Sequence, residues 1–136
     1  MRSGIESGPV PTAVTAEVAD GRHTLRAIAV PTGQGINIFL GGGEAPHVGT
    51  VAISQPRPSL TGDGTISCTT SVFNLVGHKD DILAVPLAEI LCKELQQVIV
   101  VTAGVHIDNA DEGDIARING NMNTLAAKLM EALGTR

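Results

Sequence analysis

The sequence predicts a single α+β domain spanning residues 1–136, in which an antiparallel-rich sheet from the N-terminal half carries C-terminal helices on one face. Three observations predict this fold. Between residues 14 and 73, apolar residues recur at every second position between glycine-containing turns, which is typical of short strands. From residue 83 onward, apolar residues recur at helical spacing. The length of 136 residues fits one domain, and 43% hydrophobic residues are enough to form a core.

The N-terminal half is predicted to form consecutive strands. Residues 14–18 and 25–29 alternate on either side of the tight-turn dipeptide Asp20-Gly21, which indicates a hairpin. Further strands are expected at residues 36–40, 47–53 and 65–73, with the proline-rich segment 55–58 as a break. Short strands joined by turns favour an antiparallel meander over βαβ units. We expect residues 1–11 to be a flexible tail.

The C-terminal half is predicted to be largely helical. Leucines at 83, 87, 91 and 95 mark one helix, whose regular part should begin near Pro86 because an interior proline removes a backbone donor. Residues 97–103 (QVIVVTA) are typical of a strand buried on both faces. Asn109 with Glu112 resembles a capping box for a short helix that ends at Asn119-Gly120, and a last helix should follow.

Composition excludes several classes of function. A net charge of −5 and only two aromatic residues, Phe39 and Phe73, argue against nucleic-acid binding. Apolar runs such as Val98–Val101 are far shorter than the ~20 residues that span a bilayer. Residues 1–15 do not form a secretory signal, so we expect a cytoplasmic protein. Cys68 and Cys92 are expected to be buried hydrophobic residues, with a thiolate nucleophile at Cys68 as the alternative.

Three of the four histidines share one kind of setting. His47, His78 and His106 each lie at the end of a predicted strand and beside a glycine, which allows close backbone approach. Because strand ends of one sheet can converge, we predict that these three loops surround one pocket. His23 lies inside the first hairpin, and the sequence gives it no such surroundings.

Three chemistries are open at such a pocket. A metal could be held by His47, His78 and His106, with Asp108 as an optional fourth ligand, although no HxH or HExxH spacing is present. A histidine base could serve a nucleophile among Ser67, Cys68 and Ser71, without a recognised triad motif. Alternatively, glycine-rich turns and the cation Lys79 beside His78 could hold a phosphate or carboxylate, provided that Asp80 and Asp81 pair with Lys79 or cap the next turn.

The same residues resemble a known family. The resemblance spans about residues 47–133 and rests on three motifs in a fixed order, Pro46–Gly49 (PHVG), Gly77–Asp81 (GHKDD) and Val100–Asn109 (VVTAGVHIDN). This order resembles that of the small prenylated-flavin chaperones (LpdD-like), which are encoded beside UbiD-type decarboxylases of aromatic acids. The motifs are also similar to those of the adenosylcobinamide amidohydrolases, so a small amidohydrolase is the alternative.

The resemblance to the chaperones implies an accessory cofactor-binding protein and not an enzyme. It implies non-covalent binding of prenylated flavin mononucleotide (FMN), or of FMN, and assistance in its delivery to, or maturation in, a UbiD-type decarboxylase; a flavin prenyltransferase would be a further partner. Lys79 and His78 would hold the phosphate, and the other expected cofactor-binding residues are Gly42, Gly43, His47, His106, Asp108 and Asn109. We also expect a homo-oligomer, because a sheet edge or helix face can remain to be covered.

Overall fold

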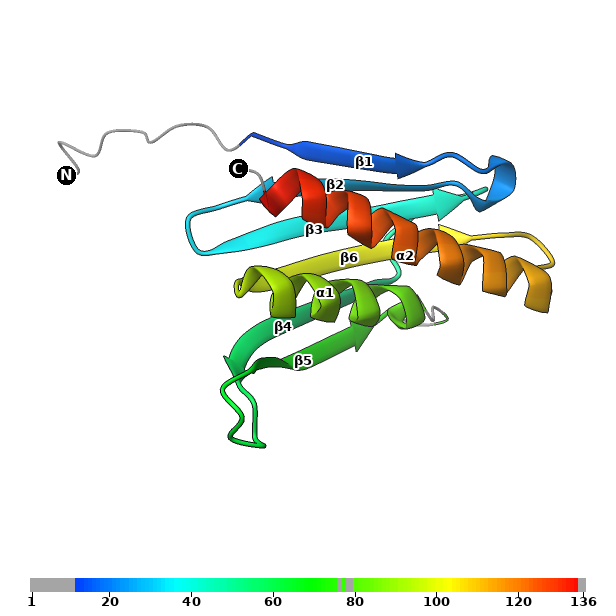
Figure 1. Ribbon diagram of the computed structural model, residues 1–136. Helices are drawn as coiled ribbons and strands as arrows, with labels where there is room; N and C mark the ends of the chain where they lie inside the picture. The colour runs from blue at the N-terminus through cyan, green and yellow to red at the C-terminus, as the bar shows by residue number, and fades with distance from the viewer. Residues whose placement is uncertain (1–11, 76, 78–79, 135–136) are drawn as a thin grey trace, which may run out of the picture.

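The computed structural model describes residues 12–75, 77 and 80–134, so the predictions for residues 1–11, His78 and Lys79 lie outside the described residues. Two helices and a six-stranded sheet form the α+β fold that the sequence predicts (Figure 1). The strands are β1 (Val14–Val18), β2 (Leu25–Pro31), β3 (Gly35–Gly43), β4 (Thr50–Pro58), β5 (Ile66–Asn74) and β6 (Val98–His106). The helices are α1 (Asp81–Leu95) and α2 (Glu112–Gly134), and a short 3₁₀ turn η1 (Gly21–His23) joins β1 to β2.

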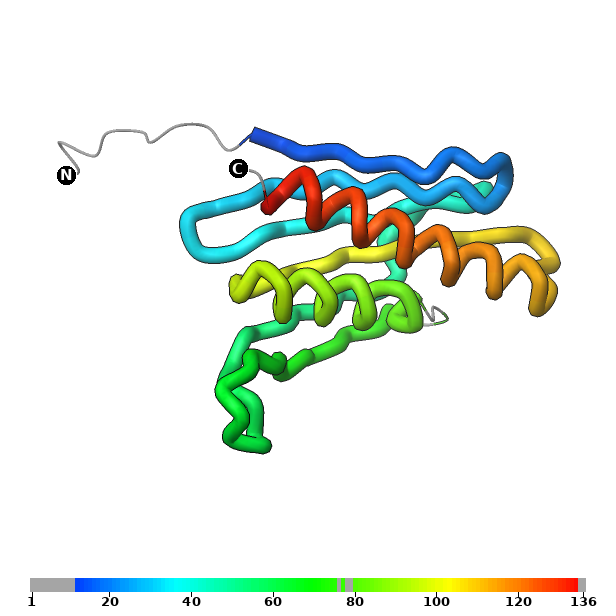
Figure 2. Tube along the Cα trace, in the orientation of Figure 1, coloured from blue at the N-terminus to red at the C-terminus, as the bar shows by residue number. Residues whose placement is uncertain are grey.

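The last strand lies in the middle of the sheet. The strand order is β1-β2-β3-β6-β4-β5, in which β6 is parallel to β3 and antiparallel to β4. Figure 2 shows β6, in yellow, between β3 and β4. The predicted continuous meander is therefore wrong between β3 and β4, because the most β-branched strand takes the central position, where it pairs on both edges.

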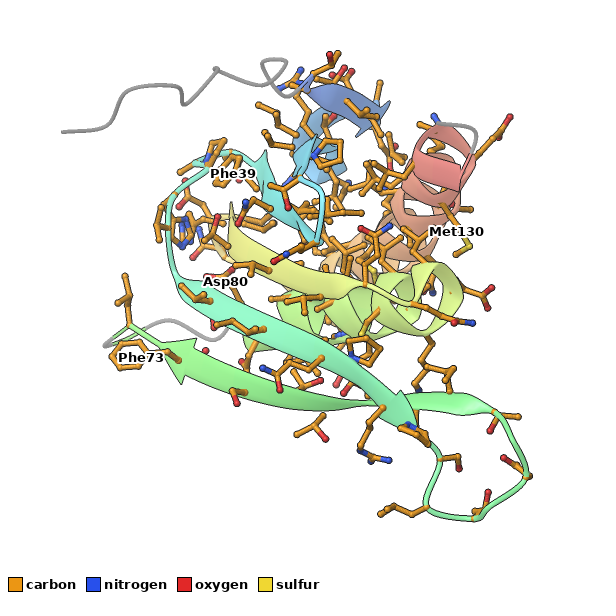
Figure 3. The ribbon with its side chains drawn as sticks, turned by 90° about the vertical axis from the view of Figure 1, so that its left-hand side faces the viewer. Phe39, Phe73, Asp80 and Met130 are labelled. Atoms are coloured by element: carbon orange, nitrogen blue, oxygen red, sulfur yellow. The ribbon has the colours of Figure 1, made fainter. Side chains whose placement is uncertain are left out.

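Both helices cover one face of the sheet, as predicted (Figure 1). Alternate strand residues such as Leu25, Leu40 and Val101 point into the core formed with Leu87 and Leu129 of the helices, and all five are fully buried. The opposite side of the sheet, which we call the open face, carries Phe39 and Phe73, whereas Met130 marks the helix side (Figure 3). The expectation that residues 97–103 are buried on both faces is therefore wrong, since Val98, Val100 and Thr102 are only half-buried.

The helix α1 begins at Asp81, five residues before the predicted start at Pro86. Pro86 lies in the second turn, where its missing N–H removes one backbone hydrogen bond. The backbone carbonyl of Asp80 accepts hydrogen bonds from the N–H groups of Leu83 and Ala84, which close the first turn. Both of these residues are buried in the core, and their burial favours the regular helix despite the proline.

The predicted break at Asn119-Gly120 does not occur, and α2 runs continuously over 23 residues. Its buried stripe includes Ile118 and Met122 on either side of the glycine, so packing outweighs the cost of about 1 kcal/mol for a helical glycine. The capping pair is also different from the predicted one. Asp111 and Asp114 each accept a hydrogen bond from the other's backbone N–H, at 2.8 and 3.0 Å.

The proline-rich segment 55–58 belongs to β4 and does not break it. The strand pairs with β6 only over residues 50–54 and with β5 over its full length. Beyond Ser54, β4 no longer pairs with β6. Pro56 and Pro58 therefore interrupt no hydrogen bonds on that side and are tolerated there. No helix of the described residues is long and apolar enough to cross a membrane.

Candidate functional site

The chain segment between β3 and β4 crosses the carboxyl end of β6, because β6 lies between these two strands. The backbone N–H groups of Glu44, His47 and Gly49 donate to the carbonyls of His106, Gly104 and Ala103, at 2.7, 3.3 and 2.8 Å. A Cβ atom on Gly104 would lie 1.7 Å from the carbonyl oxygen of His47. The glycine therefore allows the crossing, which brings His47 beside the end of β6.

Asp80 joins three parts of the molecule at this point. Its Oδ1 accepts a hydrogen bond from the backbone N–H of Val105 at 3.0 Å, and its Oδ2 lies 3.1 Å from Nε2 of His47. Its backbone begins α1, and the residue is only 8% exposed. Gly49 leaves room for this contact, since a Cβ there would lie 2.0 Å from Oδ2. A buried carboxylate thus positions His47, and Figure 3 labels it close to the end of β6.

A cavity of about 230 Å³ opens beside this cluster. His47, Asp80 and His106 line its polar side. Its apolar wall includes Ile82 in the first turn of α1 and Ile115 in the first turn of α2, which are 57% and 46% exposed. Gly77, Leu83, Val105, Ile107, Ala110, Asp114, Ile118 and Asn119 complete the lining. The cavity therefore offers two imidazoles opposite exposed aliphatic side chains.

His23 is not among the residues that line the cavity, but it contacts one that does. Its Nε2 lies 2.7 Å from Oδ1 of Asp114, which lines the cavity. Arg22 donates to the backbone carbonyl of Asp108 at 2.8 Å and lies within 3.8 Å of the carboxylates of Glu44 and Asp114. The acidic side chains nearest the cavity are thus paired with cations or imidazoles, which reduces their repulsion of an anionic ligand.

Two of the predicted site residues come together as expected, and the others take different positions. His47 and His106 both line the cavity beside Asp80. Oδ1 of Asp108 accepts a hydrogen bond from Nε2 of His106 at 2.8 Å, but Asp108 does not line the cavity. Asn109 adopts a left-handed turn conformation with φ of 53°. Gly43 packs against the backbone of His106, where a Cβ would lie 2.2 Å from the carbonyl oxygen.

Gly42 lies elsewhere, at a second hollow over β1, β2 and β3. A Cβ atom at this position would lie 2.3 Å from the carbonyl oxygen of Thr24, so the glycine allows β2 and β3 to approach closely. The binding roles of all these residues remain predictions. Sequence reasoning missed Asp80, Asp114 and Ile115 as lining residues.

The alternatives for metal binding and hydrolysis gain no support from the described residues, which do not include His78 of the predicted metal set. Among the described residues, no three His, Cys, Asp or Glu side chains are placed to hold a metal ion. The candidate nucleophiles Ser67, Cys68 and Ser71 all lie in β5, and none of them lines the cavity. Cys68 and Cys92 are buried free cysteines in the core, as predicted, and burial raises the pKa of the Cys92 thiol.

Asp20 and Asp114 connect η1 and the residue before it to α2. The pKa of each carboxyl group is lowered from 3.8 to about 2. Hydrogen bonds from Arg117 and then Asn121 lower the pKa of Asp20. The hydrogen bond from the backbone N–H of Asp111 lowers the pKa of Asp114 most, and the hydrogen bond with His23 has the next largest effect. Because the folded state resists protonation, their stabilisation is complete above pH 3.8 and is lost as the pH falls towards about 2.

We therefore expect Asp20→Asn and Asp114→Asn each to flatten the fall in the free energy of unfolding between about pH 4 and pH 2. Urea unfolding at a series of pH values, followed by far-ultraviolet circular dichroism, measures this slope. Glu131→Gln removes an exposed charge from α2 and serves as the control. If both variants had the same slope as the parent chain, the acid-induced loss of stability would not come from Asp20 and Asp114.

The fold and the site together define a small α+β protein with a cavity at the end of its sheet, where β6 ends and both helices begin. Residues 19–134 match the family model of the prenylated flavin chaperone LpdD-like domain, and the chain belongs to this family. The resemblance noted from the three motifs is thereby confirmed. No curated protein matched the sequence.

Among solved structures, the fold is similar to a chain described under "Crystal Structure of a Novel Chaperone Complex for Yeast 20S Proteasome Assembly". The two share 15% sequence identity with a TM-score of 0.59, and the match covers 93% of this chain and 98% of the yeast chain. At this identity the likeness shows a common fold. The structure that contains the yeast chain is of a chaperone complex for proteasome assembly.

Proposed function

We propose that this protein binds prenylated FMN non-covalently in the cavity beside His47 and His106 and passes it to a UbiD-type decarboxylase in the cytoplasm. The observation that carries the proposal is the convergence of two imidazoles and exposed isoleucines on one cavity, in a chain that belongs to the prenylated flavin chaperone family. A chaperone of this kind needs binding without a chemical step.

The lining residues suit part of such a ligand. Ile82 and Ile115 provide an apolar surface for a flat ring system or a prenyl-derived ring, and the imidazoles provide polar contacts for a ring edge. The protein's two aromatic residues, Phe39 and Phe73, do not line this cavity, so ring contacts there are aliphatic. When bound, the flavin would supply the chemistry that its recipient enzyme uses.

The cavity size favours a partly exposed ligand. Sites that enclose a drug-sized ligand are roughly 300–1,000 Å³. The volume of about 230 Å³ is smaller, so a mononucleotide would extend beyond the cavity. An exposed phosphate end would be accessible to a receiving enzyme, and Lys79 and His78 are the proposed phosphate ligands from the sequence. Partial enclosure is consistent with binding that can be reversed during transfer.

The proposal predicts that the protein retains prenylated FMN through gel filtration after co-expression with a flavin prenyltransferase, as measured by its visible absorption spectrum. His47→Ala, His106→Ala and Ile115→Ser should each lower the retained flavin at least about tenfold, since losing one charged or buried contact costs about 1.4 kcal/mol or more. Incubation of the loaded parent protein with an apo-decarboxylase should move the chromophore to the larger protein.

Leu60→Ser is the matched control for Ile115→Ser, because Leu60 is an 88%-exposed aliphatic residue in the connection between β4 and β5. It should retain flavin like the parent chain. Circular dichroism confirms that each variant is folded. If the folded cavity variants and Leu60→Ser all retain the same amount of flavin, the ligand does not occupy this cavity.

A further inference from the structure

The open face carries an apolar row that crosses the whole sheet. The strand register places Ile28, Phe39, Val51 and Phe73 side by side in one row, together with Thr15 and Thr102. Ile28 and Phe73 are 46% and 68% exposed. A neighbouring row adds Val30, Val100 and Ile53, with the polar residues Asn37 and Ser71 in the same row. Apolar surface of this extent on a folded domain marks an interaction site.

A hollow of about 360 Å³ interrupts the open face at one side. Ile28, Phe39 and Pro46 line it, together with Thr15 and the paired side chains of Glu17 and Arg26. Gly41 forms part of its floor, and a Cβ there would lie 2.7 Å from the ring of Phe39. At the opposite side of the sheet, Phe73 projects from β5 (Figure 3). The face therefore bears a cavity on one half and a prominent aromatic side chain on the other.

We propose that a second copy of this chain covers the open face, with Phe73 of each copy entering the hollow beside Ile28 and Phe39 of the other. A two-fold axis between the sheets and parallel to their strands reverses the strand order, so β5 of one copy lies over β1 of the other. The same rotation places the apolar row on itself, with Phe73 above Thr15 and Val51 above Ile28. Two sheets then pack face to face, about 10 Å apart.

The dimensions and the charge of the face favour this occupant. Six strands at ~4.8 Å, with five to nine residues each at ~3.3 Å, give a face of roughly 760 Å², close to the ~800 Å² that each partner buries in a stable interface. Among the described strands, the charged side chains on this face are the paired Glu17 and Arg26, and Arg57 near the end of β4. A face without net negative charge can meet its own copy although the chain carries −5.

Sedimentation velocity of the full chain tests the proposal and does not depend on flavin. The parent chain should sediment with twice its 14.0 kDa mass at micromolar concentration. Ile28→Asp and Phe73→Asp should raise the dimer dissociation constant at least about 100-fold, because each buries an unpaired charge in the interface. Leu60→Asp, which adds the same charge away from the face, should leave the dimer intact.

A tryptophan reporter tests the specific contact, since the chain contains no tryptophan. Phe73→Trp should show blue-shifted emission at concentrations where the dimer forms, and adding Ile28→Asp should return the emission to that of an exposed indole. Leu60→Trp should show exposed emission throughout. A monomeric parent chain overturns the proposal, even if the open face then binds a decarboxylase. A dimer that is insensitive to Ile28→Asp and Phe73→Asp overturns it as well.

Discussion

Gly104→Ala is expected to destabilise the fold by at least about 3 kcal/mol, because the added methyl group has no space and its neighbour is backbone. A Cβ at Gly104 would lie 1.7 Å from the carbonyl oxygen and 2.2 Å from the carbonyl carbon of His47. Relief would require the segment 44–49 to move away from β6 and break its hydrogen bonds to residues 103–106. His47 would move with it, so flavin retention should be lost together with stability.

Gly120→Ala is the matched control, because a Cβ at this position in α2 meets nothing within 4 Å. Alanine is a better helix former than glycine, so this variant should gain about 0.5–1 kcal/mol. Urea unfolding followed by circular dichroism compares the two variants, since the chain has no tryptophan or tyrosine to report unfolding. A Gly104→Ala variant as stable as the parent would show that the segment does not cross β6 in this way.

The local elements of the fold follow from residue patterns, whereas the strand order does not. Alternation around Asp20-Gly21 predicts the first hairpin because its pairing partners are close in the sequence. The position of β6 depends on pairing with β3, more than fifty residues away, and a single sequence contains no direct signal for that register. The helix errors at Pro86 and Gly120 have one cause, since burial of the apolar stripe outweighs the local preference of one residue.

The candidate site was predictable to the extent that it consists of strand ends. His47 and His106 were found because each lies at the end of a predicted strand and beside a glycine. The contact between His23 and Asp114 was missed because the two residues lie 91 positions apart in the sequence. Asp114 carried a usable signal, since Asp111 and Asp114 have the spacing of a helix-capping pair. Asp80 carried only the signal of an N-cap, a short polar residue directly before an apolar helix. Its side chain makes no capping hydrogen bond and contacts Val105 and His47 instead, which that signal does not predict.

Asp80→Ala is expected to destabilise the protein by about 3 kcal/mol and to abolish flavin retention. The substitution leaves the N–H of Val105 without its acceptor and removes the carboxylate beside His47 at a position only 8% exposed. Nδ1 of His47 lies 2.9 Å from the carbonyl oxygen of Ala45, and its Nε2 lies 3.1 Å from Oδ2 of Asp80, so the ring is held at both nitrogens.

Asp80→Asn separates the hydrogen bonds from the charge. The asparagine carbonyl can accept from the N–H of Val105, and its amide can donate to Nε2 of His47, so both contacts can form without the carboxylate charge. We expect this variant to lose less than about half the stability lost by Asp80→Ala, as measured by urea unfolding. Equal losses in the two variants would assign the effect to charge alone. No loss in Asp80→Ala would contradict the role of Asp80 in joining β6, α1 and the segment that carries His47.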